Sequence, residues 1–292
     1  MARAAVPLLA RLVRNPRVVV GGLILLVLVV AGVFAPLLSP LDPLEQDLLA
    51  PLQAPVWSAA VPPVEAGEPV HWLGTDSLGR DVLSRLIWGA RTALTVSVIA
   101  TALTALIGTV LGALAGFLGG RIDTFISRLV DVWMAFPPVL LAVVLVALLG
   151  TGLTSVIVAI VVVDWTRFAR VVRAEAQAQR ALDYVTSARM LGLGPTRIIL
   201  SEVMPNVLPL LITLLTLEMG IAIVVELILS FVGLSVASGA STWGGMLAEG
   251  RLYVNQAPLL MVLPTVATMV AVVGLNAFGD GLRRELDPVV RG

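Results

Sequence analysis

Lysine and cysteine are absent from this sequence of 292 residues, and histidine occurs only once, at position 71. Without cysteine, the chain can form no disulfide, thiolate metal site or cysteine nucleophile. Without lysine, it lacks the residue that a G-x-x-x-x-G-K-[ST] loop places against the phosphates of ATP. The composition therefore excludes a standard ATP-hydrolysing site, and the single His71 excludes an H-E-x-x-H zinc site.

Charged residues are also scarce, at 13% of the chain, whereas 58% of the residues are hydrophobic. A soluble globular domain usually carries about 25% charged residues, which help to cover a surface that faces water. The hydrophobic residues occur in runs, and most of these runs are long enough to cross a bilayer core of about 30 Å. The sequence therefore predicts an all-α integral membrane protein.

We expect six transmembrane helices. The third and fourth are divided only by Gly150-Thr151-Gly152, which predicts a tight turn. A secretory signal peptide is the alternative for the first run, but that run is too long and lacks a small-residue cleavage site. The expected spans are 18–38, 92–118, 130–149, 153–168, 207–234 and 258–278.

Arginine is distributed unevenly between the segments that connect these spans. Only Arg80, Arg85, Arg91 and Arg251 fall opposite the N-terminus, and the other fifteen of the nineteen arginines fall on the N-terminal side. Because basic residues are enriched in cytoplasmic loops, we expect cytoplasmic N- and C-termini and an outer, acidic, proline-rich loop. The chain then divides into an N-terminus with the first transmembrane helix, an outer loop with an interfacial helix, a transmembrane core and a cytoplasmic tail. Their ranges are 1–38, 39–91, 92–280 and 281–292.

The outer loop ends in a glycine-containing segment of mixed charge, His-Trp-Leu-Gly-Thr-Asp-Ser-Leu-Gly-Arg-Asp-Val-Leu-Ser-Arg at 71–85. From Val82 onward the apolar residues have helical spacing, which predicts an interfacial helix with Trp88 near the lipid headgroups. Two interpretations stay open, an ion-pair cluster that orients the second span or a contact with a ligand. The charged side chains that can pair with one another are Asp76, Arg80, Asp81 and Arg85.

A second unusual segment, 183–206, lies between the expected fourth and fifth spans. Gly192-Leu193-Gly194 breaks a short helix, and Pro195 suits the first position of a second one. Pro205 marks the start of the fifth span. The residues alone fit either an ordinary connecting loop or a helix that transmits force to a partner.

This segment is similar to the E-A-A---G motif of the permease subunits of bacterial ABC importers, which forms a coupling helix for the ATPase. Gly192 holds the motif glycine and Ala188 its second alanine, whereas Thr186 and Ser187 replace the glutamate and the first alanine. The replacement removes the acidic side chain that would pair with the ATPase at position 186. The resemblance implies a coupling segment comprising Asp183, Tyr184, Thr186, Ser187, Ala188, Leu191, Gly192, Leu193, Pro205 and Asn206.

The outer segment resembles the signature before the second span of dipeptide, oligopeptide and nickel permeases. Its signature residues are His71, Gly74, Thr75, Asp76, Gly79, Arg80, Asp81, Arg85 and Arg91. Three further stretches agree in order along the chain: 131–137, 229–234 leading to Trp243-Gly244, and 279–288. The pattern fits the second permease of such systems, the one with the shorter outer loop.

The resemblance implies a type I ABC importer permease fold with six transmembrane helices and a cytoplasmic coupling helix, in the bacterial cytoplasmic membrane. It implies a second homologous permease, two ATPase subunits or domains and an external solute-binding protein as partners. The substrate would be a peptide, or a nickel, glutathione or opine type of solute. No cofactor would bind this chain, since ATP and magnesium belong to the partner subunits, and no nucleic acid is implied. From the predicted topology alone, we expect the binding protein to dock on the outer loops 39–90 and 235–257.

Four carboxylates lie in or near the apolar spans, where an ionised group costs about 2.5 kcal/mol or more. Asp164 is three residues from Arg167, and Asp131 is three residues from Arg128, so we predict two ion pairs along single helices. Glu218 and Glu226 have no arginine nearby in sequence and share roughly one helix face. Two hypotheses stay open for Glu218 and Glu226, a translocation pathway or packing against the partner permease.

Three functions of other classes compete with an ATP-driven importer. An ion-coupled secondary transporter would explain buried carboxylates but has no use for a coupling segment. An intramembrane enzyme finds no support, because the sequence contains no G-x-S-x-G motif and no metal-ligand cluster. An exporter permease differs from an importer only in direction, which sequence physics does not give.

Overall fold

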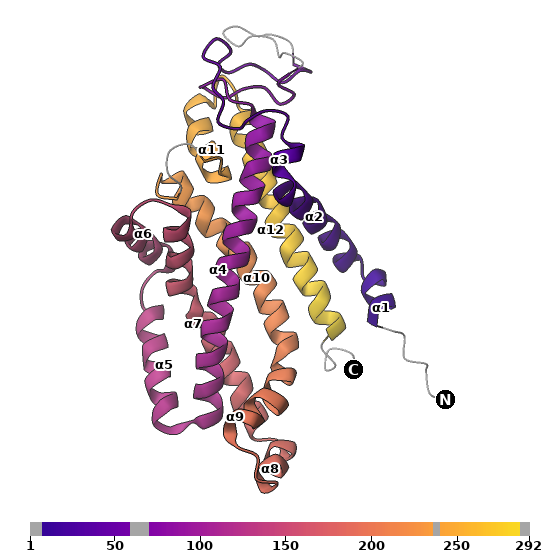
Figure 1. Ribbon diagram of the computed structural model, residues 1–292, viewed down its shortest axis with the longest axis vertical. Helices are drawn as coiled ribbons and strands as arrows, with labels where there is room; N and C mark the ends of the chain where they lie inside the picture. Colours follow the sequence, from indigo (N-terminus) through magenta and orange to yellow (C-terminus); the bar gives the residue numbers. More distant parts are fainter. Residues whose placement is uncertain (1–7, 59–69, 236–239, 287–292) are drawn as a thin grey trace.

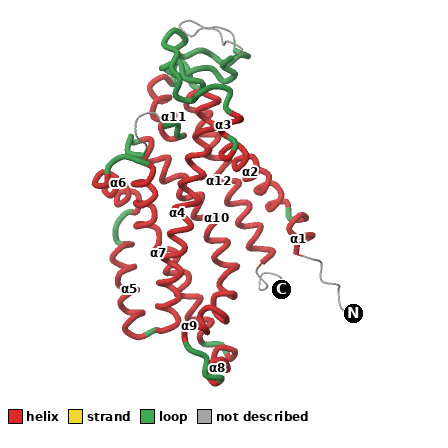
Figure 2. The backbone as a smooth tube through the Cα atoms, viewed as in Figure 1, coloured by secondary structure: helices red, strands yellow, loops and turns green. Residues whose placement is uncertain are grey.

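The computed structural model describes residues 8–58, 70–235 and 240–286. Within these ranges the chain is helical with connecting loops and contains no β-strand (Figure 2). Parts of several predicted segments lie outside the described residues. They are residues 1–7 of the N-terminus, 59–69 and 236–239 of the outer loops, and 287–292 of the tail.

The helices form one elongated bundle (Figure 1). Its elements are α1 (Leu8–Arg14), α2 (Pro16–Val33), α3 (Ala35–Leu38), α4 (Val82–Leu118), α5 (Gly120–Met134), α6 (Pro138–Leu149), α7 (Leu153–Arg180), α8 (Asp183–Met190), α9 (Pro195–Ile198), a π-helical turn (Ile199–Val203), α10 (Met204–Phe231), α11 (Trp243–Gly250), a 3₁₀ turn (Arg251–Tyr253) and α12 (Leu259–Leu286).

Four helical segments of the described chain are long and apolar enough to cross a membrane: Pro16–Val33, Val82–Leu118, Pro195–Phe231 and Leu259–Leu286. Helices α5 and α6 make a fifth if the bent pair is counted as one span. The predicted count of six is therefore not confirmed. Helix α7 has 28 residues but is not one of these long apolar segments, because its second half is rich in charged residues.

The predicted third span, 130–149, is not one straight helix. Helices α5 and α6 meet at 86° across the short break Ala135-Phe136-Pro137. Pro137 and Pro138 cause the break, since proline lacks the amide hydrogen that continues a helix and disfavours helical geometry in the residue before it. The prediction failed because the apolar run continues through a backbone bend.

Two other predicted boundaries do not coincide with the ends of helices. Helix α4 runs unbroken from Val82, so the residues assigned to an interfacial helix are its first turns, and the 91/92 boundary lies inside it. The predicted start of the fifth span at 207 lies inside a helical segment, because α9, the π-helical turn and α10 are continuous from Pro195. Pro205 lies just after the π-helical turn, at the second residue of α10.

Small residues let α4 and α7 approach closely. Gly108, Gly112 and Gly116 repeat every four residues along α4, and a Cβ at Gly108 would lie 2.4 Å from the Trp165 carbonyl oxygen on α7. This spacing is the small-xxx-small pattern of membrane helix interfaces. Large apolar side chains cover outward faces instead, such as Leu23 on α2, which is 61% exposed. The bundle therefore packs through small residues and presents large ones outward.

The two ends of the bundle differ. Figure 1 shows the outer loop, α3 and α11 at one end, and α8, α9 and the α4–α5 junction at the other. Helix α1 and the C-terminal end of α12 lie in the same half as α8. The segments with most of the arginines are thus gathered toward one end.

Candidate functional site

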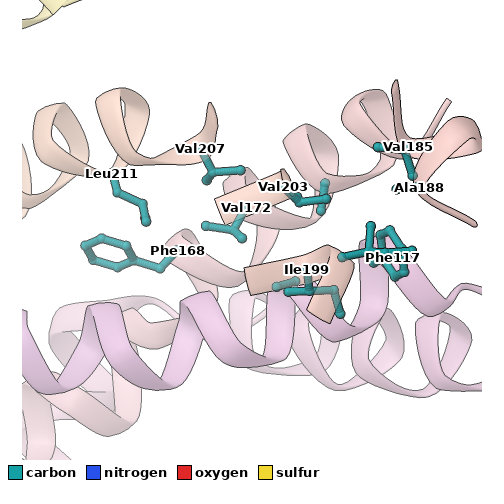
Figure 3. Close-up of a cluster of buried hydrophobic side chains, with 12 residues drawn as sticks. Phe117, Phe168, Val172, Val185, Ala188, Ile199, Val203, Val207 and Leu211 are labelled. Atoms are coloured by element: carbon teal, nitrogen blue, oxygen red, sulfur yellow. The ribbon is translucent and has the colours of Figure 1, made fainter. Parts of the chain in front are cut away.

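Helix α8 is held to the end of the bundle by its buried face. Val185 and Ala188 belong to an apolar cluster of buried side chains (Figure 3), while the two residues between them are exposed. The cluster is built by α4, α7, α8, α9, the π-helical turn and α10. Its other buried members are Ala113, Phe117, Phe168, Val172, Ala176, Ile198, Ile199, Val203, Val207 and Leu211. Ala188, the motif's second alanine, is small because its face is enclosed.

The opposite face of α8 is exposed and ends in an apolar tip. Thr186 and Ser187 are exposed, and the Ser187 hydroxyl donates to the Asp183 carbonyl at 2.9 Å. Met190 is 84% exposed and Leu191 is 82% exposed. Two large apolar side chains at a water-facing end indicate a surface that a partner covers. Sequence reasoning missed Met190, which occupies one of the three positions that the motif leaves unspecified between Ala188 and Gly192.

A glycine ends α8. Gly192 has φ of +81°, and no atom lies within 4 Å of where its Cβ would be. The Gly192 amide donates to the Arg189 carbonyl at 2.9 Å, and the Leu193 amide donates to the Ala188 carbonyl at 3.2 Å. This is a Schellman motif, in which glycine supplies the left-handed conformation. A glycine is needed at position 192 because the backbone φ is positive there, and not because a side chain would clash with a neighbour.

Polar contacts fix α8 to the start of α10. The Asn206 side-chain amide donates to the Tyr184 hydroxyl at 3.3 Å and to the Glu202 carbonyl at 2.7 Å. The Tyr184 hydroxyl donates to Gln179 Oε1 at 2.6 Å. Burial raises the pKa of Tyr184, against the opposing effect of its hydrogen bond from Asn206. The tyrosine therefore stays a neutral donor, and these bonds link α8 to the end of α7 and to the start of α10.

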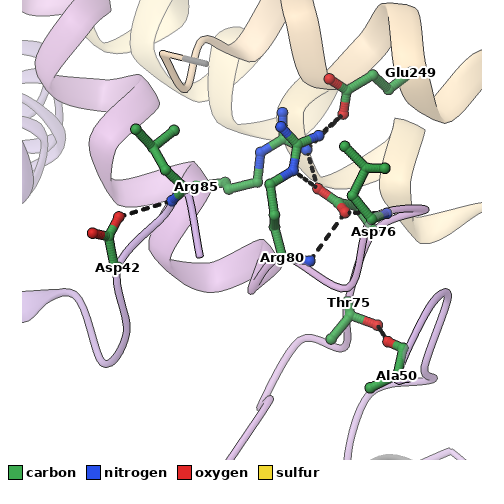
Figure 4. A network of polar contacts seen from close by, with 9 residues as sticks. Asp42, Ala50, Thr75, Asp76, Arg80, Arg85 and Glu249 are labelled. Atoms are coloured by element: carbon green, nitrogen blue, oxygen red, sulfur yellow. Dashed lines mark hydrogen bonds and ion pairs between the residues drawn. The ribbon is translucent and has the colours of Figure 1, made fainter. Parts of the chain in front are cut away.

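At the outer end, two arginines share two carboxylates (Figure 4). Asp76 accepts from Arg80 Nε at 2.8 Å and also pairs with Arg85. Glu249 Oε2, on α11, accepts from Arg80 Nη2 and from Arg85 Nη1, each at 2.7 Å. All but Glu249 are buried. The predicted ion-pair cluster is present, and it joins the outer loop, α4 and α11.

Asp81 is not part of this cluster, contrary to the prediction. Its Oδ1 lies 3.2 Å from His71 Nδ1, while its Oδ2 accepts from the Ser84 amide at 2.7 Å. Asp81 therefore caps the N-terminus of α4. Sequence spacing alone cannot tell a helix cap from an ion-pair partner.

The other signature residues shape the loop. The Thr75 hydroxyl donates to the Ala50 carbonyl at 2.6 Å. Gly74 and Gly79 have φ of +80° and +72°, and a Cβ at Gly79 would lie 1.8 Å from the Asp47 carbonyl oxygen. Arg91 lies apart, with its guanidinium 5.3 Å from the ring centroid of Trp88.

The carboxylates of the spans are placed in different ways. The predicted Asp164–Arg167 pair is confirmed at 3.5 Å. The predicted Asp131–Arg128 pair is wrong, because Asp131 lies 3.4 Å from Arg170 on α7 instead. The partner of Asp131 is therefore determined by the contact between α5 and α7 and not by the spacing of residues along α5.

Glu218 and Glu226 are each 1% exposed. Glu218 accepts from Arg167 Nη1 at 3.3 Å, and Glu226 accepts from the hydroxyls of Ser230 at 2.6 Å and Ser235 at 3.0 Å. Both carboxylates are therefore satisfied inside this chain. The sequence did not show the first contact, because its residues lie 51 positions apart.

A cavity of about 470 Å³ lies among α6, α7, α10 and α12. Asp164, Arg167 and Asn276 are the hydrophilic side chains on its otherwise apolar wall, and neither Glu218 nor Glu226 lines it. Sequence reasoning did not single out Asn276, whose one signal is an amide within an apolar helix. The described cavity thus presents one carboxyl group, one guanidinium group and one amide on an apolar wall.

Comparison with known proteins agrees with this architecture. Residues 108–292 match the family model of the binding-protein-dependent transport system inner membrane component, and residues 8–55 match the N-terminal transmembrane domain of oligopeptide transport permease C. In solved structures, the chain resembles the methionine ABC transporter in an inward-facing conformation. The TM-score is 0.57 at 20% identity, over 69% of this chain and 96% of that one.

Three curated relatives are permease proteins. A di/tripeptide transport system permease of Pseudomonas aeruginosa is 39% identical over 93% of this chain and 88% of its own length. A dipeptide transport system permease of Alkalihalophilus pseudofirmus is 35% identical over 96% and 88%. A glutathione transport system permease of Salmonella typhimurium is 42% identical over 76% and 73%. The chain belongs to the family of binding-protein-dependent inner membrane components, and it is a permease subunit of an ABC importer without ATPase chemistry of its own.

Proposed function

We propose that this chain forms half of the pathway of an ATP-driven importer of di- or oligopeptides. A second homologous permease completes the pathway, and two ATPase subunits or domains bind ATP and magnesium. An external solute-binding protein delivers the peptide to the outer loops 39–90 and 235–257. The complex lies in the bacterial cytoplasmic membrane with both termini of this chain in the cytoplasm, where most of its arginines then lie.

The observation that carries the proposal is the tip of α8. The side chains of Met190 and Leu191 are exposed, whereas the other face of α8 is packed into the bundle. An ATPase cleft would cover this apolar tip. Because α8 is fixed to α4, α7 and α10, a movement of the ATPase would be transmitted to three long helices at once.

Peptides are the substrate class that the relatives and the cavity support best. Two of the three relatives above are named for di- or tripeptides, and the third for glutathione, itself a tripeptide. The cavity holds both a carboxylate and a guanidinium, Asp164 and Arg167, which complement the two ends of a zwitterionic solute. Within this chain, Glu218 acts by holding Arg167 in place. A direct pathway role for Glu218 and Glu226 stays a prediction.

Affinity purification of the tagged chain in mild detergent, followed by mass spectrometry, tests the proposal. A second permease and ATPase subunits are expected to co-purify. Reconstituted with its partners, the complex is expected to take up peptides only with ATP. Uptake by the chain alone without ATP would overturn the proposal and favour an ion-coupled secondary transporter. ATP-dependent uptake of nickel chelates or opines but not peptides would overturn the substrate class alone.

A further inference from the structure

An asparagine interrupts the apolar sequence of α12. Asn276 lies in the second half of that helix and is half-buried, and its side-chain amide makes no hydrogen bond to any residue that the structure describes. The threonines of the same helix differ, because the hydroxyls of Thr265 and Thr268 donate to carbonyls of α12 itself, at 2.8 and 2.9 Å. The amide of Asn276 therefore contributes no hydrogen bond to the fold of this chain.

This amide is open to the cavity among α6, α7, α10 and α12. Asn276 lines that cavity, and so does Gly220, the residue of α10 that comes near it. A Cβ at Gly220 would lie 3.5 Å from Asn276 Oδ1. Because glycine carries no side chain, α10 leaves the space beside the amide free, and a molecule in the cavity can reach it.

The charged groups of the same wall are held in place by α7 and α10. Arg167, whose side chain is 31% exposed, contacts Asp164 through Nη2 and Glu218 through Nη1. Its Nε–H has no hydrogen-bond partner within the described part of the chain. A mostly apolar cavity of about 300–1,000 Å³ with a few polar groups that fix orientation is typical of a small-molecule site. The cavity of about 470 Å³ fits that description.

Two kinds of partner could use the free amide, a helix of the second permease or the imported solute. Asparagine does link membrane helices through hydrogen bonds. The solute is favoured here because the amide shares one cavity with a carboxyl group and a guanidinium group. A side-chain amide also carries the same N–H donor and C=O acceptor as a peptide group, so the two can pair through two hydrogen bonds.

We propose that Asn276 is a specificity-determining residue that binds the peptide group of the solute. Its Oδ1 accepts from the peptide N–H, and its Nδ2 donates to the peptide carbonyl. The importer then prefers a peptide to an ester of the same shape and charge, because the ester has no N–H to donate. This inference rests on the proposed function and assigns to one side chain the recognition of the bond that makes a solute a peptide.

ATP-dependent uptake of alanyl-alanine and of its ester analogue alanyl-lactate by the reconstituted complex tests the proposal. The analogue replaces the peptide N–H with oxygen and keeps both charged ends. Each solute is supplied at a concentration that saturates the solute-binding protein, so that the rates report on the permeases. The wild type is expected to take up the peptide at least about fivefold faster, the effect of one hydrogen bond. Asn276→Leu is expected to lose this preference.

Thr268→Val is the matched control, since it also removes a polar group from α12 but at a residue that does not line the cavity, and it is expected to keep the preference. Asn276→Leu is expected to be as heat-stable as the wild type, because it removes no hydrogen bond of this chain.

Three outcomes would overturn the inference, and they are distinguishable. The same ratio of rates in the wild type and Asn276→Leu would overturn it alone. Loss of the second permease from the purified Asn276→Leu complex would also overturn it and assign the amide to the contact between the permeases. If the wild type takes up no alanyl-alanine with ATP, the proposed function falls and this inference falls with it.

Discussion

Glu218 of α10 accepts a hydrogen bond from Arg167 of α7 at 3.3 Å, although 51 positions separate the two in sequence. Asp164, three residues before Arg167, lies 3.5 Å from the same guanidinium. Two buried carboxylates thus share one arginine inside the bundle. The arrangement exists because α7 and α10 pack against each other.

Arg167→Gln is expected to destabilise the protein, because it leaves two buried carboxylates without a cation. Breaking a buried ion pair typically costs about 3–5 kcal/mol. Thermal unfolding in detergent would measure the loss, and Arg167→Gln combined with Glu218→Gln is expected to restore part of it. Arg170→Gln is the control, since its pair with Asp131 is half-exposed and contributes about 1 kcal/mol or less. Equal losses in the two arginine variants would contradict the shared-arginine arrangement.

Gly192→Ala is expected to lower ATP-dependent uptake and to cost about 1–2 kcal/mol of local stability. The cause is the left-handed backbone of Gly192, which an alanine adopts only with strain. Gly194→Ala is a close control, because Gly194 also has open space around its Cβ position but has φ of −67°. Uptake assays in reconstituted vesicles would compare the two. Similar uptake by both variants would show that the end of α8 tolerates a shift.

Leu191→Asp is expected to weaken ATPase association by about tenfold or more, since it puts a charge at the apolar tip of α8. The chain itself is expected to fold, because this side chain is 82% exposed. Leu200→Asp is the control: Leu200 is 65% exposed but lies on the π-helical turn, away from the tip. Co-purification of the ATPase from detergent would be quantified for both. If Leu200→Asp loses the ATPase and Leu191→Asp retains it, the docking surface lies on the π-helical turn and not at the tip of α8.

Glu249→Gln is expected to loosen the outer loop. The change leaves Asp76 as the one carboxylate facing the buried guanidinium groups of Arg80 and Arg85. Loss of charge-assisted hydrogen bonds typically costs about 1.5–3 kcal/mol. Limited proteolysis would detect faster cleavage of the outer loop, while Glu45→Gln, at an exposed loop position, is expected to cleave as the wild type does. Unchanged cleavage in Glu249→Gln would show that α11 is held by packing alone.

Local features were predictable where one segment decides them. The break at Gly192 and the helix start at Pro195 follow from the conformations that glycine and proline permit. The Asp164–Arg167 pair lies within one helix turn, so its spacing was sufficient. These features depend on residues only a few positions apart.

Features that join distant segments were not predictable. Asp131 pairs with Arg170 on another helix instead of with Arg128. Asp81 was also mispredicted, although its partners His71 and the Ser84 amide lie within ten positions, because spacing alone does not distinguish a helix cap from an ion pair. Hydropathy also hid the 86° bend between α5 and α6, because an apolar run has the same composition whether it is straight or folded. For Asp131 the local partner Arg128 was present, and the packing of α5 against α7 selected Arg170 instead.

The sequence by itself determined that the chain enters a membrane, that it lacks ATPase chemistry, and that a glycine-ended helix follows α7. Composition and single-residue backbone preferences are properties of the chain, whatever its neighbours are. Only the tertiary structure decided that Arg167 serves two carboxylates, that Glu249 closes the outer cluster, and that Asp131 pairs with Arg170. Those relationships need helices far apart in sequence to lie side by side, and burial then makes each unpaired polar group costly enough to fix its partner.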